Sequence, residues 1–69
     1  MLFTDVSEER AIRAFRKKGF WIVGGKKHTV MTDGTHFITI PRHKRINPYT
    51  LKAIIRGAGL TDKEFKELL

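Results

Sequence analysis

The dipeptide Asp33-Gly34 is the feature that most restricts what this chain can fold into. It stands between two runs rich in β-branched and aromatic residues, at 28–32 and 35–40. An Asp-Gly pair is preferred in two-residue type I′ turns because both residues accept positive φ angles. The sequence therefore predicts a β-hairpin in which the last residue of the first run directly faces the first residue of the second.

Helices and one further strand are predicted around this hairpin. Ser7 followed by two glutamates is typical of a helix start, and Gly19 is a suitable stop. Asn47 before Pro48 is a second typical start, and Thr61 with Glu64 forms a capping box. The predicted elements are a helix at 8–18, a strand at 20–23, the two hairpin strands, a helix from Pro48 to Gly59 and a short helix after Thr61.

The length of the chain allows one domain, at 1–69, because a body this small has little interior to divide. The chain has no cysteine, so packing alone must hold the fold. Three antiparallel strands with helices on one face bury the most apolar surface that this order of elements offers. The predicted fold is therefore α+β, in the order α-β-β-β-α with a short C-terminal helix.

The charge of the chain points to an anionic partner. Fourteen Lys and Arg against seven Asp and Glu give a net charge of +7, which repels itself unless an anion binds. Nucleic acid is the leading candidate. No run of about 18 apolar residues and no leader-like segment is present, so no membrane partner is predicted and a cytoplasmic location is expected.

Strand alternation predicts that His28 lies on the open face of the sheet. In the predicted register His28 faces Thr39 and Val30 faces Phe37, so these four side chains share one face. The other face carries side chains suited to burial under helices, namely Met31, Ile38 and Ile40. A slip of one residue would reverse the two faces.

A histidine beside two lysines has the ingredients for cutting RNA. Imidazole moves a proton near neutral pH, and Lys26 and Lys27 are placed to hold a phosphate beside His28. The alternative is that His28 is a polar strand residue after a solvated turn. Composition alone favours that alternative and supports no more than a basic RNA-binding domain.

The other histidines and the aromatic residues receive separate predictions. His36 is expected to be partly buried and hydrogen-bonded, and His43 to contact phosphate or solvent, with an auxiliary catalytic role as the alternative. Trp21 and Phe37 are expected to pack in the core, although exposed rings would stack on bases. The histidine spacing matches no zinc site, so neither metal nor cofactor is expected. The basic residues predicted to contact RNA are Arg13, Arg16, Lys17, Arg42, Lys44 and Arg45.

Four segments in order along the chain resemble the HicA, or YcfA-like, toxin family. They are Arg16-Lys17-Lys18-Gly19-Phe20, Gly25-Lys26-Lys27-His28, Ile38-Thr39-Ile40-Pro41-Arg42-His43 and Thr50-Leu51-Lys52-Ala53-Ile54-Ile55-Arg56-Gly57-Ala58-Gly59-Leu60. The resemblance implies a fold like that of double-stranded-RNA-binding domains. It also implies that His28 is the catalytic residue. The chain departs from the family in having Gly-Lys-Lys-His where Gly-Ser-His is expected, and Asn47-Pro48-Tyr49 where a Gly often precedes Thr-Leu.

The resemblance further implies a type II toxin-antitoxin system, with ribosome-independent mRNA cleavage, growth arrest and neutralisation by a HicB antitoxin. The predicted mechanism is metal-free, with His28 taking the proton of a ribose 2′-hydroxyl and Lys26 and Lys27 stabilising the developing charge. His43, or His28 acting again through water, would protonate the leaving oxygen. An acidic antitoxin is expected to cover His28. The rival interpretations are a non-catalytic double-stranded-RNA-binding module and a protein that acts only by binding another protein.

Overall fold

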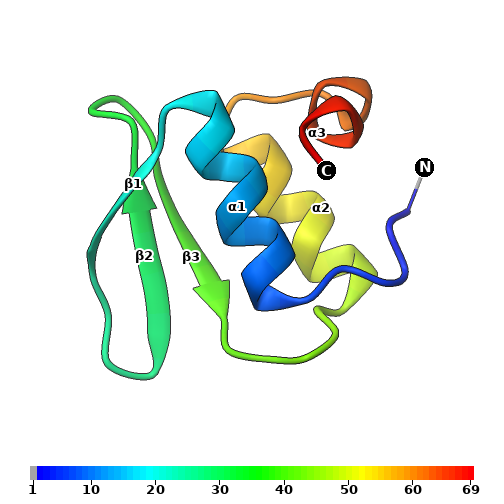
Figure 1. Ribbon diagram of the computed structural model, residues 1–69, viewed down its shortest axis with the longest axis horizontal. Coiled ribbons are helices and arrows are strands. Elements are labelled where there is room, and N and C mark those ends of the chain that lie inside the picture. Colours follow the sequence, from blue (N-terminus) through cyan, green and yellow to red (C-terminus); the bar gives the residue numbers. More distant parts are fainter. Residues whose placement is uncertain (1) are drawn as a thin grey trace.

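The computed structural model describes residues 2–69 and has the predicted α+β architecture. Three strands form one antiparallel sheet in the order β1-β2-β3, and the helices lie to one side of it (Figure 1). Helices α1 and α2 both contact β3. The elements are α1 (Glu8–Lys18), β1 (Trp21–Gly24), β2 (His28–Thr32), β3 (Phe37–Pro41), α2 (Pro48–Gly57) and α3 (Asp62–Leu68).

The helix ends follow the capping residues of the sequence. The Ser7 side chain accepts a hydrogen bond from the backbone N–H of Arg10, and Gly19 ends α1 at a φ of 108°. The predicted bounds of α1 are therefore confirmed, as is the capping box between Thr61 and Glu64 at the start of α3. Helix α2 ends at Gly57, two residues before the predicted stop. Within residues 2–69 no helix is long and apolar enough to cross a membrane.

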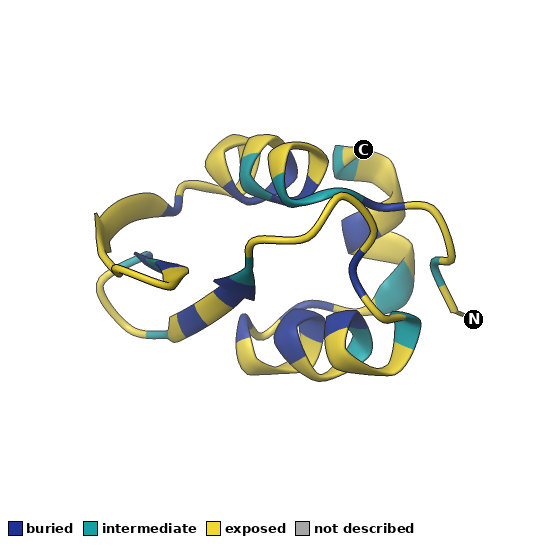
Figure 2. Cartoon of the chain, turned by 90° about the horizontal axis from the view of Figure 1, so that it is seen from below, coloured by how far each residue is buried: buried dark blue, intermediate teal, exposed yellow. Residues whose placement is uncertain are grey.

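Phenylalanine rings join the helices to one another and to the start of the sheet. The ring centroids of Phe15 and Phe65 are 5.2 Å apart, which ties α1 to α3, and Phe3 contacts Phe65 at 5.3 Å. Phe20 packs on Phe15 at 5.6 Å and is buried, so it ends the connection from α1 instead of beginning β1. Figure 2 shows the buried residues on the facing sides of the helices and of β3.

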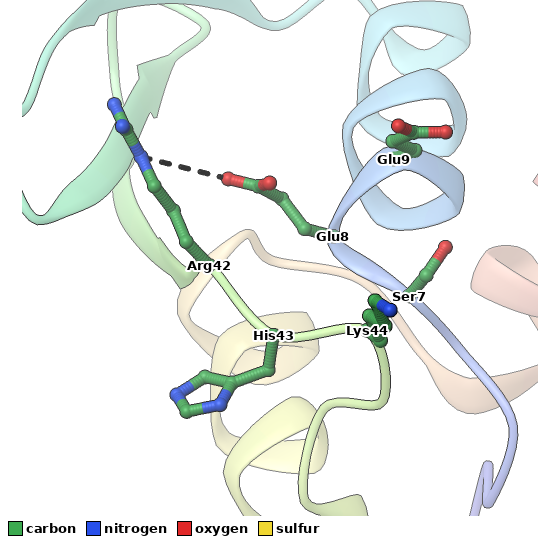
Figure 3. Close-up of a pocket in the computed structure, with 6 residues that line it drawn as sticks. All are labelled: Ser7, Glu8, Glu9, Arg42, His43 and Lys44. Carbon is green, nitrogen blue, oxygen red and sulfur yellow. Dashed lines mark ion pairs between the residues drawn. The ribbon is translucent and has the colours of Figure 1, made fainter.

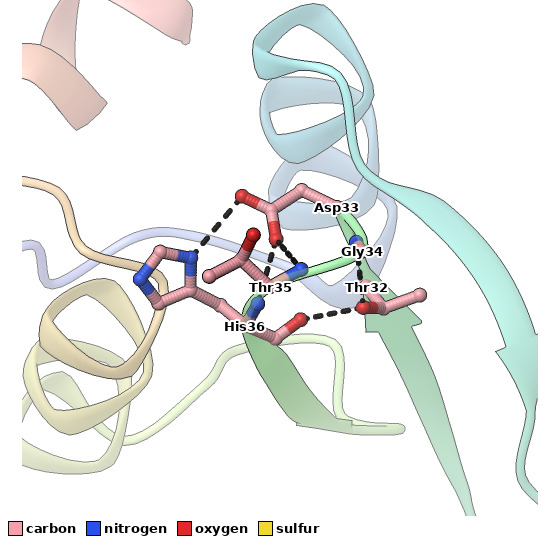
Figure 4. A network of polar contacts seen from close by, with 5 residues as sticks. All are labelled: Thr32, Asp33, Gly34, Thr35 and His36. Atoms are coloured by element: carbon pink, nitrogen blue, oxygen red, sulfur yellow. Dashed lines mark hydrogen bonds and ion pairs between the residues drawn. The ribbon is translucent and has the colours of Figure 1, made fainter.

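The hairpin loop is longer than the sequence predicts. Thr32 pairs with Phe37, so the loop has four residues where two were predicted. The carboxylate of Asp33 explains the difference, because its Oδ1 accepts hydrogen bonds from the backbone N–H groups of Thr35 at 2.9 Å and His36 at 2.7 Å (Figure 4). These bonds remove both residues from the strand ladder, and the predicted register is therefore wrong.

The predicted faces of the hairpin are nevertheless confirmed. The register differs from the prediction by two residues, and an even difference leaves every side chain on its predicted face. His28 and Thr39 are exposed, and Val30 is half-buried. Thr29, Met31, Ile38 and Ile40 are buried on the side of the helices.

The prediction that Trp21 and Phe37 pack in the core is wrong. Trp21 is 50% exposed and Phe37 is 72% exposed. Neither belongs to one of the ring pairs within residues 2–69. The physical reason is that the helices cover only the other face of the sheet, which leaves the face of these two rings without a second layer.

The Asp33 carboxylate should make stability depend on pH in the acid range. Hydrogen bonds from the backbone of His36 and Thr35 lower the pKa of Asp33 from 3.8 to about 2. A lowered folded-state pKa gives stability that is present above the unfolded value and is lost as pH falls through the folded value. We expect Asp33→Asn, which keeps an acceptor oxygen but no charge, to lower the melting temperature at pH 5 to 7, and the difference from the unmodified chain to shrink between about pH 4 and pH 2. A difference that stays constant down to pH 2 would contradict the assignment.

Candidate active site

His28 is the first residue of β2 and lies at the end of the sheet opposite the hairpin loop. It pairs with Pro41, and its side chain is exposed on the face away from the helices. Its ring has no hydrogen-bond or ion-pair partner among residues 2–69. An imidazole without a protein partner on an open surface is free to exchange a proton with a bound molecule.

The turn before His28 presents two free cations and is shaped by a glycine. Lys26 and Lys27 are exposed, and within the described chain neither forms an ion pair. Gly25 has a φ of 111°, and a β-carbon there would overlap the carbonyl oxygen of His28 and lie 2.8 Å from its carbonyl carbon. The turn therefore folds directly onto the backbone of His28, and its path depends on the absence of a side chain at position 25.

A polar cluster that the sequence did not predict links this turn to α1. The Oε2 atom of Glu8 accepts a hydrogen bond from Thr29 Oγ1 at 3.0 Å. The same atom lies 3.8 Å from Arg42 Nε, and Figure 3 shows this ion pair. Arg42 also donates to the carbonyl oxygen of Gly25 at 3.5 Å. Glu8 was interpreted only as an acid near a helix start, and no pattern in the sequence relates it to residues 21 to 34 positions later.

His43 lies in the loop after β3, two residues beyond the partner of His28. Its backbone is fixed, because its N–H donates to the carbonyl of Pro41 and its carbonyl accepts from the N–H of Glu8. It lines an open pocket of about 280 Å³, and Figure 3 shows its ring turned away from Glu8. The pocket residues are Ser7, Glu8, Glu9, Arg42, His43 and Lys44. Within residues 2–69 no hydrogen bond or ring contact joins His43 to His28.

His36 has a structural role that agrees with its prediction. It is partly buried, and its Nδ1 lies 3.2 Å from Asp33 Oδ2 in the hairpin loop (Figure 4). A β-carbon on Gly59 would lie 2.9 Å from its Nε2, so the ring fills the space between the hairpin and the end of α2. No group of three or more metal-binding side chains occurs within residues 2–69.

The basic residues predicted to contact RNA fall into two groups. Arg42, Lys44 and Arg45 lie in the loop after β3, close to the end of the sheet that holds His28. Arg42 is paired with Glu8, and Arg45 Nε lies 3.6 Å from Asp5 Oδ1. The second group is exposed on α1, in the helical layer behind the sheet, and consists of Arg13, Arg16 and Lys17. Three of the six predicted contacts thus lie in the loop that leaves the His28 end of the sheet, and the other three lie on α1.

The comparison with known families matches the chain to a family of toxins. The family model described as "HicA toxin of bacterial toxin-antitoxin" matches residues 9–60, which include both lysines of the turn, His28 and His43. No curated protein matches the chain. The matched segment covers α1 except its first residue, Glu8, together with the whole sheet and α2, and leaves α3 outside.

Proposed function

The chain belongs to the HicA toxin family, and on that premise we propose that it is an mRNA interferase toxin of a type II toxin-antitoxin system, with His28 as its catalytic residue. Members of the family are toxins, in general with ribonuclease activity. The observation that carries the proposal is an exposed imidazole directly after two exposed lysines, none of the three paired with any other group of residues 2–69, on a chain of net charge +7. These groups supply a base and a phosphate-binding site side by side.

The proposed reaction is a transesterification that uses only groups of the chain and the substrate. Neutral His28 accepts the proton of a ribose 2′-hydroxyl, and the 2′-oxygen bonds to the adjacent phosphorus while the bond from phosphorus to the 5′-oxygen breaks. The products are a 2′,3′-cyclic phosphate and a 5′-hydroxyl. Lys26 and Lys27 stabilise the charge that develops on the phosphate. The leaving oxygen takes its proton from His43, or from protonated His28 through water.

Two features hold the proposed base in place. The Gly25 turn packs against the backbone of His28, and Arg42 joins the carbonyl of Gly25 to Glu8. Glu8 in turn binds Thr29, the residue after His28. The site is thus anchored to the first turn of α1. We propose that these residues position His28, and that the exposed Arg42 also contacts phosphate of the RNA.

The test is incubation of an end-labelled transcript with the purified chain, with and without a chelator. Cuts that persist in chelator and leave 2′,3′-cyclic phosphate ends would support the proposal. A transcript that is bound and stays intact would favour a non-catalytic RNA-binding module instead.

The family also implies a cognate antitoxin. We propose that it resembles HicB and binds over His28 and the Lys26-Lys27 turn, because an acidic protein there would neutralise the free lysines and exclude RNA. We expect saturating antitoxin to protect His28 from modification by diethyl pyrocarbonate and to stop cleavage. Cleavage undiminished at saturation, with His28 still reactive, would contradict this placement.

A further inference from the structure

We propose that the open face of the sheet is a track for single-stranded RNA on which Trp21 and Phe37 stack bases of the substrate. The proposal deepens the function above and rests on it for the nature of the ligand. It starts from two exposed rings on the sheet that are not part of the core. Four of the five phenylalanines are in ring pairs or buried in the core, namely Phe3, Phe15, Phe20 and Phe65.

The strand register puts both exposed rings in one row. Trp21 pairs with Thr32 across β1 and β2, and Thr32 pairs with Phe37 across β2 and β3, so the three side chains share a face. Thr32 is only 4% exposed although this face has no second layer, because its hydroxyl is bound into the hairpin loop and a ring stands on each side. Strand spacing puts the two rings about 10 Å apart.

The same face carries His28 at its other end. His28 and Thr32 are four residues apart on β2, which corresponds to about 13 Å along the strand. Between these ends lie half-buried Val30 and exposed Thr39, which pair with each other. Along the strands, the face therefore carries two aromatic side chains at one end, Val30 and Thr39 in the middle, and the imidazole with the two lysines of the preceding turn at the other end.

The chemistry of this face selects single-stranded nucleic acid. Aromatic rings stack on bases of any sequence, and lysines neutralise phosphates, so one strand satisfies both ends of the face. In an RNA duplex the bases are stacked inside, and recognition relies on phosphates, 2′-hydroxyls and shape, for which exposed rings have no use. The net charge of +7 argues against a neutral apolar protein segment as occupant.

Such a track would place the cut at a fixed position relative to the stacked bases. Rings that hold two bases at the hairpin end fix which phosphate reaches His28. Because stacking tolerates every base, the track would set the register of the strand while imposing little sequence preference.

The experiment measures binding without cleavage. A single-stranded 2′-O-methyl RNA oligonucleotide cannot be cut through its 2′-oxygen, and Trp21 is the only tryptophan of the chain, so its fluorescence reports directly on the proposed contact. We expect the oligonucleotide to quench this fluorescence. Affinities of the variants are read from the anisotropy of a dye-labelled oligonucleotide, which does not depend on Trp21, and we expect Trp21→Leu and Phe37→Leu each to weaken binding about 5- to 100-fold. Phe37→Trp should restore binding, because it restores the ring.

Tyr49 supplies the matched control. It is 71% exposed, like Phe37, but lies at the start of α2, so Tyr49→Leu should change affinity by less than about twofold. Equal effects of Phe37→Leu and Tyr49→Leu would overturn the proposal. So would equal quenching and affinity with a duplex, or leucine variants that lose only antitoxin binding. Quenching with the expected losses in a chain that cuts no RNA would refute the catalytic function and leave this inference standing.

Discussion

Replacement of His28 by alanine is expected to slow RNA cleavage by about 10²- to 10⁴-fold, the usual contribution of a general acid-base residue. Folding should be unaffected, because the side chain is exposed and its ring has no partner within residues 2–69. The measurement is the rate at which end-labelled transcript disappears in the presence of chelator, beside a thermal melt of each protein.

His36→Ala is the matched control for this experiment. It removes a ring that contacts Asp33 and the end of α2, so it should lower the melting temperature while cleavage by the folded protein stays within about threefold. His43→Ala separates the two sources of the second proton. A large loss of rate would assign the general acid to His43, and a small one to His28 acting through water. Cleavage by His28→Ala within a few-fold of the unmodified chain would refute the mechanism.

The secondary structure was largely predictable because its determinants are local. The capping groups act on backbone groups within four residues of themselves, as Ser7, Gly19 and the Thr61 capping box do. The observed bounds of α1 are accordingly the predicted ones. The placement of His28 was predictable for a different reason. Which face a side chain lies on depends only on whether the register is shifted by an odd or an even number of residues. The predicted register was wrong by two residues, so every side chain stayed on its predicted face.

The register itself was not predictable from the turn dipeptide. Asp33-Gly34 favours a two-residue turn, but the Asp33 carboxylate binds two backbone N–H groups beyond it and draws Thr35 and His36 into the loop. An aspartate at this position is compatible with a two-residue turn and with the observed four-residue loop. Which of the two forms depends on contacts such as that of His36 with the end of α2. Turn propensity lacks this tertiary information.

The surroundings of the site were the least predictable part. Burial of Trp21 and Phe37 was expected from their hydrophobicity, yet whether a ring is covered depends on which strands the helices reach. Glu8 was correctly placed at a helix start, and its contacts with Thr29 and Arg42 arise only when distant segments meet. The two free lysines beside His28 were predictable because they adjoin it in the chain.

Substitution of Gly25 by alanine is expected to reduce RNA cleavage by about 10- to 100-fold, because misplacement of a catalytic group by about 1 Å is enough for such a loss. A β-carbon at this position would overlap the carbonyl oxygen of His28, so the turn must change its path and move His28, Lys26 and Lys27. The neighbour is backbone and has no flexible end that could yield.

Gly19→Ala separates this steric effect from the cost of a positive φ angle. Gly19 has a φ of 108°, against 111° for Gly25, but a β-carbon there would have nothing within 4 Å. Gly19→Ala should therefore cost about 1 to 2 kcal/mol of stability through its backbone conformation and leave the cleavage rate of the folded protein unchanged. Gly25→Ala should carry the same backbone cost and, in addition, lose activity with altered amide chemical shifts at His28. If both variants cleave at the same rate, the close approach of Gly25 to His28 is not what positions the base. The contacts of Arg42 and Glu8 would then have to hold the turn in place.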